Sequence, residues 1–367
     1  MSSSFDSIKY KKEMSTTPSP HVTNNHRATT GISSLPTDIL ESHILTRLDG
    51  QTLASATCAS VSLSAGQHNH QLWSNICHSA WPSTAGDRIS KIISAFSDDK
   101  NGPLSFFSQS FPLPGPDPTT VPPPPQRPTS SLPVSELISA VDIYYRNKSI
   151  LTKTEETETT NDWFRCWPFR IDLLDPKDVV PTQIPQPDDE AMCTALMEDM
   201  TLSWILIDPV NKQAVNLSSH KPVSVHRHWL SGEVKVCFVS ILGFDGVVVQ
   251  FGIVVNCGGS EDGEMQVREV TMEVEDMDGK LLNGRDSMVI LQKVMEGKRG
   301  SGVDRVEEAR MRHRRYQEMK KERRERKSRV EWTLDILSLT VVLSIFVALL
   351  FVFFYNFLLK TQKLNNS

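Results

Sequence analysis

The chain has 367 residues, 39% of them hydrophobic and 23% charged, which is ample for one or two folded cores with linkers. Its formal net charge of −5 is unevenly distributed, because residues 298–329 hold 14 Lys and Arg against 6 Asp and Glu. The six cysteines have no CxxC pair and no dense spacing, which excludes a small disulfide-stapled domain and indicates reduced thiols.

The N-terminal segment, residues 1–31, is rich in Ser, Thr and Asn and has no apolar periodicity. We therefore expect a disordered arm. Its first twelve residues are polar and charged, without the apolar core of a secretory signal peptide. The sequence predicts that the bulk of the protein stays on the cytosolic side of a membrane.

Residues 32–96 are expected to form a compact helical unit. Ser34 is a candidate helix cap, Pro36 suits the first turn, and Asp38 faces the positive end of the helix dipole. The turn residues Asp49 and Gly50 should close this helix. Its apolar residues recur at helical spacing, at Ile39, Leu40, Ile44, Leu45 and Leu48.

Two further helical pieces follow in the same unit. Residues 52–59 should form a second helix, and a third piece should end at Leu72 and Trp73. Three short helices bury little surface by themselves, so part of their apolar face should meet a partner.

This segment resembles the F-box motif. It reads LPTDILESHILTRLDGQTLASATCASVS followed by HQLW, which is similar to the family's Leu-Pro opening, apolar first helix, central turn-helix and closing Leu-Trp. The resemblance implies binding to a Skp-type adaptor, and through it to a cullin scaffold, a RING subunit and a ubiquitin-conjugating enzyme. The adaptor contacts would fall on Leu35, Pro36, Ile39, Leu40, Ile44 and Leu48, with Leu72 and Trp73 closing the small core.

One position departs from the family's pattern. Family members often have Trp after the second helix, whereas this chain offers Cys58, Ala59, Val61 and Leu63 there. The change can weaken adaptor affinity, although apolar replacements that keep the packing are usually tolerated.

The next segment, residues 97–133, contains eleven prolines between positions 101 and 133. This composition predicts a semi-rigid polyproline II linker. A domain that reads PxxP could also dock there.

Residues 134–296 are predicted to form an antiparallel β-rich domain with short helices. Residues 134–147 place apolar side chains on one helical face, with Ser135 as a cap, so we expect a helix there. The pattern then changes to β-branched and aromatic segments separated by turn residues. The expected strands cover 163–174, 200–207, 223–229, 233–242, 246–255 and 266–274.

The layout as a whole also resembles a group of plant F-box proteins. The shared sequences are VDIYYRNK, WPFRIDLLDPKDVVP, LSWILIDP and PVSVHRHWLSGEVKV. In that family the region after the F-box recruits the protein to be ubiquitinated, which makes residues 134–296 the candidate substrate-recruiting domain.

The β-rich region offers little catalytic chemistry. His226 and His228 share a strand face, as a metal site would need, but no third and fourth ligands accompany them or His220. The sequence has no GxGxxG, Walker A, GxSxG or HExxH motif. We therefore expect no catalytic residue, no metal and no cofactor.

Four tryptophans of this region allow two interpretations. Trp163, Trp167, Trp204 and Trp229 can build a packed aromatic core, which we favour, or a sugar-stacking surface of a lectin-like module.

Residues 297–335 are expected to form a basic juxtamembrane helix. Its Lys and Arg could follow a nucleic-acid backbone or act as a nuclear import signal. Its position directly before an apolar segment instead favours membrane topology and contact with anionic lipid, so we expect no nucleic-acid partner.

Residues 336–359, ILSLTVVLSIFVALLFVFFYNFLL, contain no charged residue. As a helix they would extend about 36 Å, enough to cross a hydrocarbon core of about 30 Å. Only Lys360 and Lys363 follow in the short tail 360–367, so the basic side, and with it the N-terminus, should be cytosolic. A buried helix of a soluble fold is the alternative.

The sequence thus predicts an α+β protein held by one C-terminal span in an endomembrane or the plasma membrane. We expect a non-catalytic, membrane-tethered substrate-recognition subunit of a Skp/cullin/F-box ubiquitin ligase. The alternative is a non-enzymatic membrane scaffold or binding protein, with a lectin-like β domain, whose F-box-like helices contact another partner.

Overall fold

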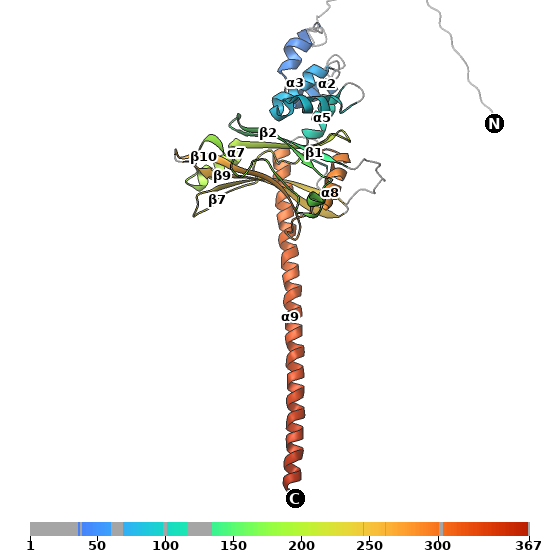
Figure 1. The fold of residues 1–367 in the computed structure, drawn as a ribbon, viewed down its shortest axis with the longest axis vertical. Helices are drawn as coiled ribbons and strands as arrows, with labels where there is room; N and C mark the ends of the chain where they lie inside the picture. The colour runs from blue at the N-terminus through green and yellow to red at the C-terminus, as the bar shows by residue number, and fades with distance from the viewer. Residues whose placement is uncertain are drawn as a thin grey trace, which may run out of the picture.

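The structure is a computed structural model that describes Pro36 and residues 39–59, 69–97, 101–115, 134–244, 246–260, 262–300 and 304–365. Side chains are described for all of these except residues 41, 244 and 357–365. Figure 1 shows the N-terminal helices on one side of two antiparallel sheets, and a long C-terminal helix that passes the sheets and runs far beyond them on the other side. The α+β class predicted from the sequence is confirmed.

The N-terminal helical unit differs in detail from the expected three helices. Its elements are the π-helical turn η2 (Leu40–Ile44), the 3-10 turn η3 (Leu45–Arg47), α2 (Gly50–Ala59), α3 (His70–Ala80), the 3-10 turn η5 (Pro82–Ala85), α4 (Asp87–Ser94) and α5 (Gly102–Ser110). The Asp49 carboxylate accepts from the Thr52 backbone N–H at 2.9 Å, so Asp49 caps α2. Leu72 and Trp73 were expected to end a helix but lie in the first turn of α3, which the Asn69 side chain caps.

Helix α5 lies inside the segment expected to be a proline-rich linker, and this part of the prediction is wrong. Its Phe106 and Phe107 are buried against the other N-terminal helices. A Cβ on Gly50 would come within 2.2 Å of Phe107 Cζ, so the start of α2 requires glycine. The rest of the predicted linker, residues 116–133, lies outside the described residues.

The first sheet has the strand order β2-β1-β5-β6. Its strands are β1 (Glu136–Tyr145), β2 (Lys148–Glu158), β5 (Met200–Asp208) and β6 (Gln213–Asn216). The helix expected over 134–147 is wrong, because this segment forms β1. Val141 faces the second sheet while Ile138 faces the N-terminal helices, so both faces of β1 are buried and the alternation typical of a strand is lost.

The second sheet has the order β3-β10-β9-β8-β7, with β4 paired to β10. Its strands are β3 (Arg170–Asp172), β4 (Val180–Pro185), β7 (Ser224–Arg227), β8 (Val234–Phe244), β9 (Val247–Gly259) and β10 (Glu264–Asp276). The strands expected from residue 200 onward are confirmed. The strand expected over 163–174 is only partly right, because α6 (Asp162–Cys166) precedes β3, and α7 (Glu190–Asp199) and α8 (Gly284–Glu296) were not predicted.

Two hydrophobic cores hold these layers together. Trp204, Phe238 and Phe251 are fully buried between the two sheets. Trp73 and Phe106 pack with Ile205 on the outer face of the first sheet. The N-terminal helices therefore share the second core with the first sheet and pack directly on the β domain, instead of being held apart from it by the expected semi-rigid linker.

Helix α9 (Arg305–Asn365) spans 61 residues, or about 92 Å at 1.5 Å per residue. Its first part lies against β8, where Val239 and Ile241 point away from the inter-sheet core and are nevertheless buried. The Tyr316 hydroxyl donates to the backbone carbonyl of Asp276 at 2.9 Å. The expected juxtamembrane and membrane-spanning helices are thus one continuous helix, docked on the β domain at its N-terminal end.

Candidate functional site

The accessible edge of the N-terminal helical unit contains the first residues predicted to contact an adaptor. The backbone N–H groups of Ile39 and Leu40 both donate to the Pro36 carbonyl at 3.1 Å, so Pro36 begins a turn. Pro36 is exposed and the Ile39 side chain is 43% exposed. Leu35, which was also predicted to contact the adaptor, lies outside the described residues.

The remaining predicted contact residues divide by burial. Leu40, Leu72 and Trp73 are at most 4% exposed and form the core of the helical unit. Ile44 and Leu48 are half-buried and pack against the same core. The surface that these residues can offer a partner is therefore the edge formed by Pro36 and Ile39, with the outer parts of Ile44 and Leu48. We call this the Pro36 edge.

A buried polar joint fixes the helical unit on the first sheet. The Ser83 hydroxyl and backbone N–H donate to the Asp142 carboxylate at 2.6 and 3.0 Å. Burial raises the pKa of Asp142, and the hydrogen bonds from Ser83 oppose that shift. At the periphery of this joint, Arg88 pairs with Glu136 at 2.8 Å and also with Glu156.

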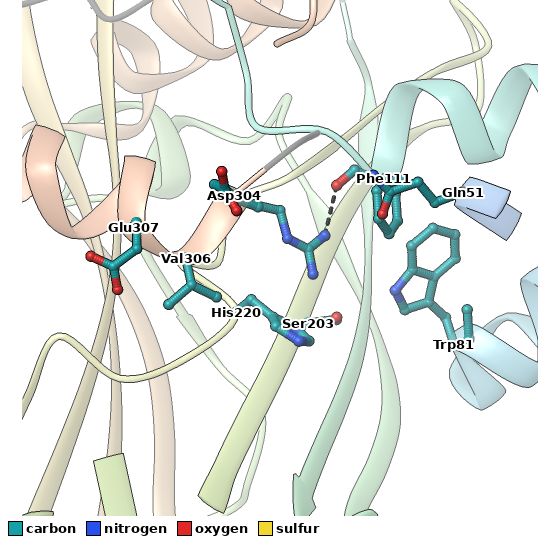
Figure 2. Close-up of a pocket in the computed structure, with 10 residues that line it drawn as sticks. Gln51, Trp81, Phe111, Ser203, His220, Asp304, Val306 and Glu307 are labelled. Carbon is teal, nitrogen blue, oxygen red and sulfur yellow. Dashed lines mark hydrogen bonds between the residues drawn. The ribbon is translucent and has the colours of Figure 1, made fainter. Parts of the chain in front are cut away.

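A cavity of about 480 Å³ lies where the helical unit, the first sheet and the start of α9 meet. Figure 2 shows Trp81 and Phe111 on one side of it and His220 and Ser203 on another. The dashed bond in that figure joins Arg305 Nη1 to the Phe111 carbonyl at 2.6 Å. This guanidinium also lies 4.9 Å from the centroid of the Phe111 ring, an arrangement that allows a cation–π interaction.

His220, in the same cavity, is held by its backbone. Its N–H donates to Ser218 Oγ at 3.1 Å, its carbonyl accepts from the Leu202 N–H at 2.9 Å, and its φ is +68°. Burial, reinforced by the charges of Arg305 and Lys221, lowers the pKa of His220 to about 3. The imidazole is therefore neutral at physiological pH and occupies a structural position.

The other two histidines considered as metal ligands, His226 and His228, are exposed on and after β7. His228 Nδ1 accepts from the Ser231 backbone N–H at 3.1 Å. Within the ranges described above, no group of three His, Cys, Asp or Glu side chains is arranged to hold a metal ion.

The four tryptophans do not form one aromatic core. Trp204 is fully buried, whereas Trp163, Trp167 and Trp229 are 68, 58 and 84% exposed. Trp163 and Trp167, on and just after α6, stack with ring centroids 6.1 Å apart and planes inclined by 24°. The expectation of a packed core is wrong for these three residues, and the stacked pair is an exposed apolar surface of the β domain.

Part of the basic stretch has a structural role that sequence reasoning missed. Arg299 donates to the Gln109 carbonyl, Arg305 to that of Phe111, and Arg312 to those of Pro114 and Gly115. We call Arg299, Arg305 and Arg312 the arginine clamp. They fasten the end of α5 and the segment after it to the β domain and α9. The sequence contained no signal for this role, because their partners are backbone carbonyls about 190 positions away.

The apolar part of α9 is long and apolar enough to cross a membrane. Its side chains from Leu337 to Tyr355 are exposed, in contrast to the docked N-terminal turns. The alternative of a buried helix in a soluble core does not fit these described residues.

Three curated proteins of Arabidopsis thaliana are similar over nearly the whole chain. The probable F-box protein At2g36090 is 46% identical over 320 residues, covering 87% of this chain and 92% of that protein. F-box protein At3g44326 is 41% identical over 82% of this chain and 83% of its own length, and F-box protein At2g27310 is 39% identical over 87% and 95%. No family model and no solved structure matches the chain.

Identity of this level over four fifths or more of each relative defines the class of protein. The chain belongs to the F-box protein family.

Proposed function

We propose that this protein is the membrane-tethered substrate-recognition subunit of a Skp/cullin/F-box ubiquitin ligase. The observation that carries the proposal is the Pro36 edge, an accessible apolar surface on the helical unit of a chain that belongs to the F-box family. A Skp-type adaptor bound there would bring the cullin and RING subunits. The protein itself contributes binding and no catalytic group.

The β domain, residues 134–296, is the proposed substrate-recruiting part. It shares a core with the helical unit, and the Ser83–Asp142 joint and the arginine clamp fix the two together. A substrate on the β domain would therefore be held in a set direction relative to the adaptor. Such rigid placement favours ubiquitin transfer to those substrate lysines that lie within a limited distance of the ubiquitin-conjugating enzyme.

The apolar part of α9 is the proposed tether. Three observations support it: its length, its exposed apolar surface, and the basic residues that precede it. The positive-inside rule then places the helical unit and the β domain in the cytosol, on an endomembrane or the plasma membrane.

The adaptor proposal is tested by co-purification from detergent extracts. Replacing Leu35, Pro36 and Ile39 together by alanine should abolish recovery of the Skp-type adaptor, and of these three residues Pro36 and Ile39 are exposed in the structure. Val179→Ala is the matched control, because Val179 is an apolar residue of the β domain with 45% exposure. Unchanged adaptor recovery in the triple variant would sink the assignment.

A second candidate function is a non-enzymatic membrane scaffold with a lectin-like β domain. The observation in its favour is the exposed, stacked pair Trp163 and Trp167, since flat aromatic faces bind sugar rings. It predicts that a glycan array binds the detergent-solubilised protein and not its Trp163→Ala/Trp167→Ala variant. If the purified protein binds glycans but does not recover a Skp-type adaptor, this candidate would be favoured over the ligase subunit.

A further inference from the structure

Most charges of the basic stretch already have partners in the structure. The arginine clamp uses three of them, and Arg310, Lys320 and Arg323 pair with Glu198, Glu275 and Asp278. Those pairs lie along the docked part of α9. The cations without a partner among the described residues are concentrated nearer the apolar segment, at Lys321, Arg324, Arg326 and Lys327.

A groove of about 670 Å³ lies beside two of these cations. It separates α9 from the turn after β10 and is lined by Met277, Asp278, Met319, Glu322, Arg323, Arg326, Lys327 and Val330. Its walls combine apolar side chains with a basic rim. The Arg323 guanidinium is 2.9 Å from Asp278, so that acidic residue is neutralised in place.

The lining residues of α9 share one face of the helix. Positions 319, 322, 323, 326, 327 and 330 recur at spacings of three and four, which is the helical repeat. Lys321 and Arg324 carry equal charge but do not line the groove, because at about 100° per residue Lys321 lies on the opposite face of the helix and Arg324 on its flank. The helix therefore offers an internal comparison between cations beside the groove and cations away from it.

We propose that this groove binds the headgroup of an anionic phospholipid, with Arg326 and Lys327 contacting its phosphate. The inference rests on the proposed membrane tether and deepens it. Val330 lies six residues before Ile336, or about 9 Å along the helix, so the groove opens close to the proposed bilayer surface.

The composition of the groove favours a lipid over a free phosphate. Met277, Met319 and Val330 supply apolar contact for the glycerol and the first acyl carbons, which an inorganic anion cannot use. The cations supply charge-assisted hydrogen bonds to the phosphate. Trp332, 66% exposed two residues further on, is of the type enriched at membrane interfaces.

The test uses the full chain in non-ionic detergent, titrated with short-chain phosphatidylserine, phosphatidylcholine or glycerophosphoserine. We expect saturable binding of phosphatidylserine that is at least about fivefold weaker in Arg326→Gln/Lys327→Gln. The double variant Lys321→Gln/Arg324→Gln removes the same charge from positions that do not line the groove and should bind nearly as the wild type does. Glu322→Gln, which removes an acidic group from the lining, should bind more tightly.

Three outcomes would contradict the proposed lipid site. If both double variants lose phosphatidylserine affinity equally, the lipid responds to the overall positive charge of the helix and not to a specific site. Equal binding of phosphatidylcholine would remove the role of the anionic headgroup, and equal binding of glycerophosphoserine would mean that a soluble phosphate suffices. Cell fractionation tests the tether separately, because lipid titration in detergent does not require membrane insertion.

Discussion

Arginine residues within one basic stretch take two different roles, set by what surrounds them. Arg312 is 3% exposed and its guanidinium donates to the carbonyls of Pro114 and Gly115, both at 2.8 Å, and also pairs with Glu308. Burial lowers the pKa of both Arg299 and Arg305 to about 10, so these two guanidinium groups stay charged at neutral pH. Arg326 and Lys327 are exposed and free to meet another molecule.

Replacing Arg312 by leucine tests the structural role. The substitution leaves two carbonyls without their donor, and an unsatisfied buried polar group costs about 1–3 kcal/mol. We expect the free energy of unfolding to fall by about 2–3 kcal/mol, with faster amide exchange over residues 304–316. Arg314→Leu, at an exposed position of the same helix, is the control and should change stability by less than about 0.5 kcal/mol. Equal losses in the two variants would contradict the clamp.

His220 should make the protein sensitive to acid. Its pKa is about 3 in the folded protein and 6.5 in the unfolded chain, so the unfolded state binds the extra proton between these values. The contribution of His220 to the free energy of unfolding is therefore greatest above pH 6.5. It decreases as the pH falls towards about 3, by at most about 5 kcal/mol in total.

His220→Asn removes the titrating ring, and asparagine tolerates the left-handed backbone at this position. Between pH 7 and pH 4 the melting temperature should fall less steeply with pH for the variant than for the wild type. His226→Asn, at an exposed histidine, should leave the wild-type slope unchanged. Parallel curves for wild type and His220→Asn would show that the imidazole is not held neutral by burial.

At the scale of elements, the helix α5 joins the helical unit to the β domain. Phe106 is fully buried, and it packs edge-on against Trp81 and Phe96, with ring centroids 5.8 and 5.4 Å apart. Phe106→Ala should lower the free energy of unfolding by about 3–5 kcal/mol, measured by chemical denaturation. Phe111→Ala, at a half-buried ring beyond the end of α5, should cost less. A loss below 1 kcal/mol for Phe106→Ala would mean that α5 is a peripheral element.

Regular alternation of buried and less buried residues made some strands easy to predict. In β9, Val249, Phe251 and Ile253 are buried and alternate with half-buried residues, and the strand was expected to begin at residue 246, one before its observed start. In β1 both faces are buried, so the period of two disappeared and a helix was predicted instead. A run of apolar residues predicts that the segment is buried. It does not show which elements will pack against each of its faces, because that depends on the tertiary structure.

The adaptor contacts stay a prediction, and the structure shows only how the described residues among them are buried. The Leu-Pro opening and the helical spacing identified the segment, and burial then divided its residues into a core and the Pro36 edge. α5 was missed because prolines around it, such as Pro112 and Pro114, dominate the local composition. Its start at Gly102 and Pro103 is nevertheless a regular helix beginning, with proline in the first turn.

At the scale of the whole molecule, α9 sets the distance between the β domain and the proposed membrane. Among the described residues, the ion pair between α9 and the β domain that lies nearest the apolar segment joins Arg323 to Asp278, and the uncharged segment begins at Ile336. The intervening turns extend about 20 Å if the helix is continuous, as it is in the structure. We therefore expect the β domain to lie close to the bilayer surface and to move as a rigid body together with α9.

Removing residues 330–367 tests this arrangement, because the docked part of α9 and the arginine clamp remain. The wild type should stay in the membrane pellet after alkaline washing and need detergent for release. The truncated protein should move to the soluble fraction, and it should still recover the Skp-type adaptor because the Pro36 edge is unchanged.

Proximity labelling from the β domain, with and without proteasome inhibition, then separates tethering from recognition. Truncation should remove membrane proteins from the labelled set, since the ligase subunit is no longer confined to the surface where they reside. If fractionation is unchanged by the truncation, α9 is not the tether. If the labelled set is unchanged although the protein has become soluble, the β domain selects its substrates without help from the membrane.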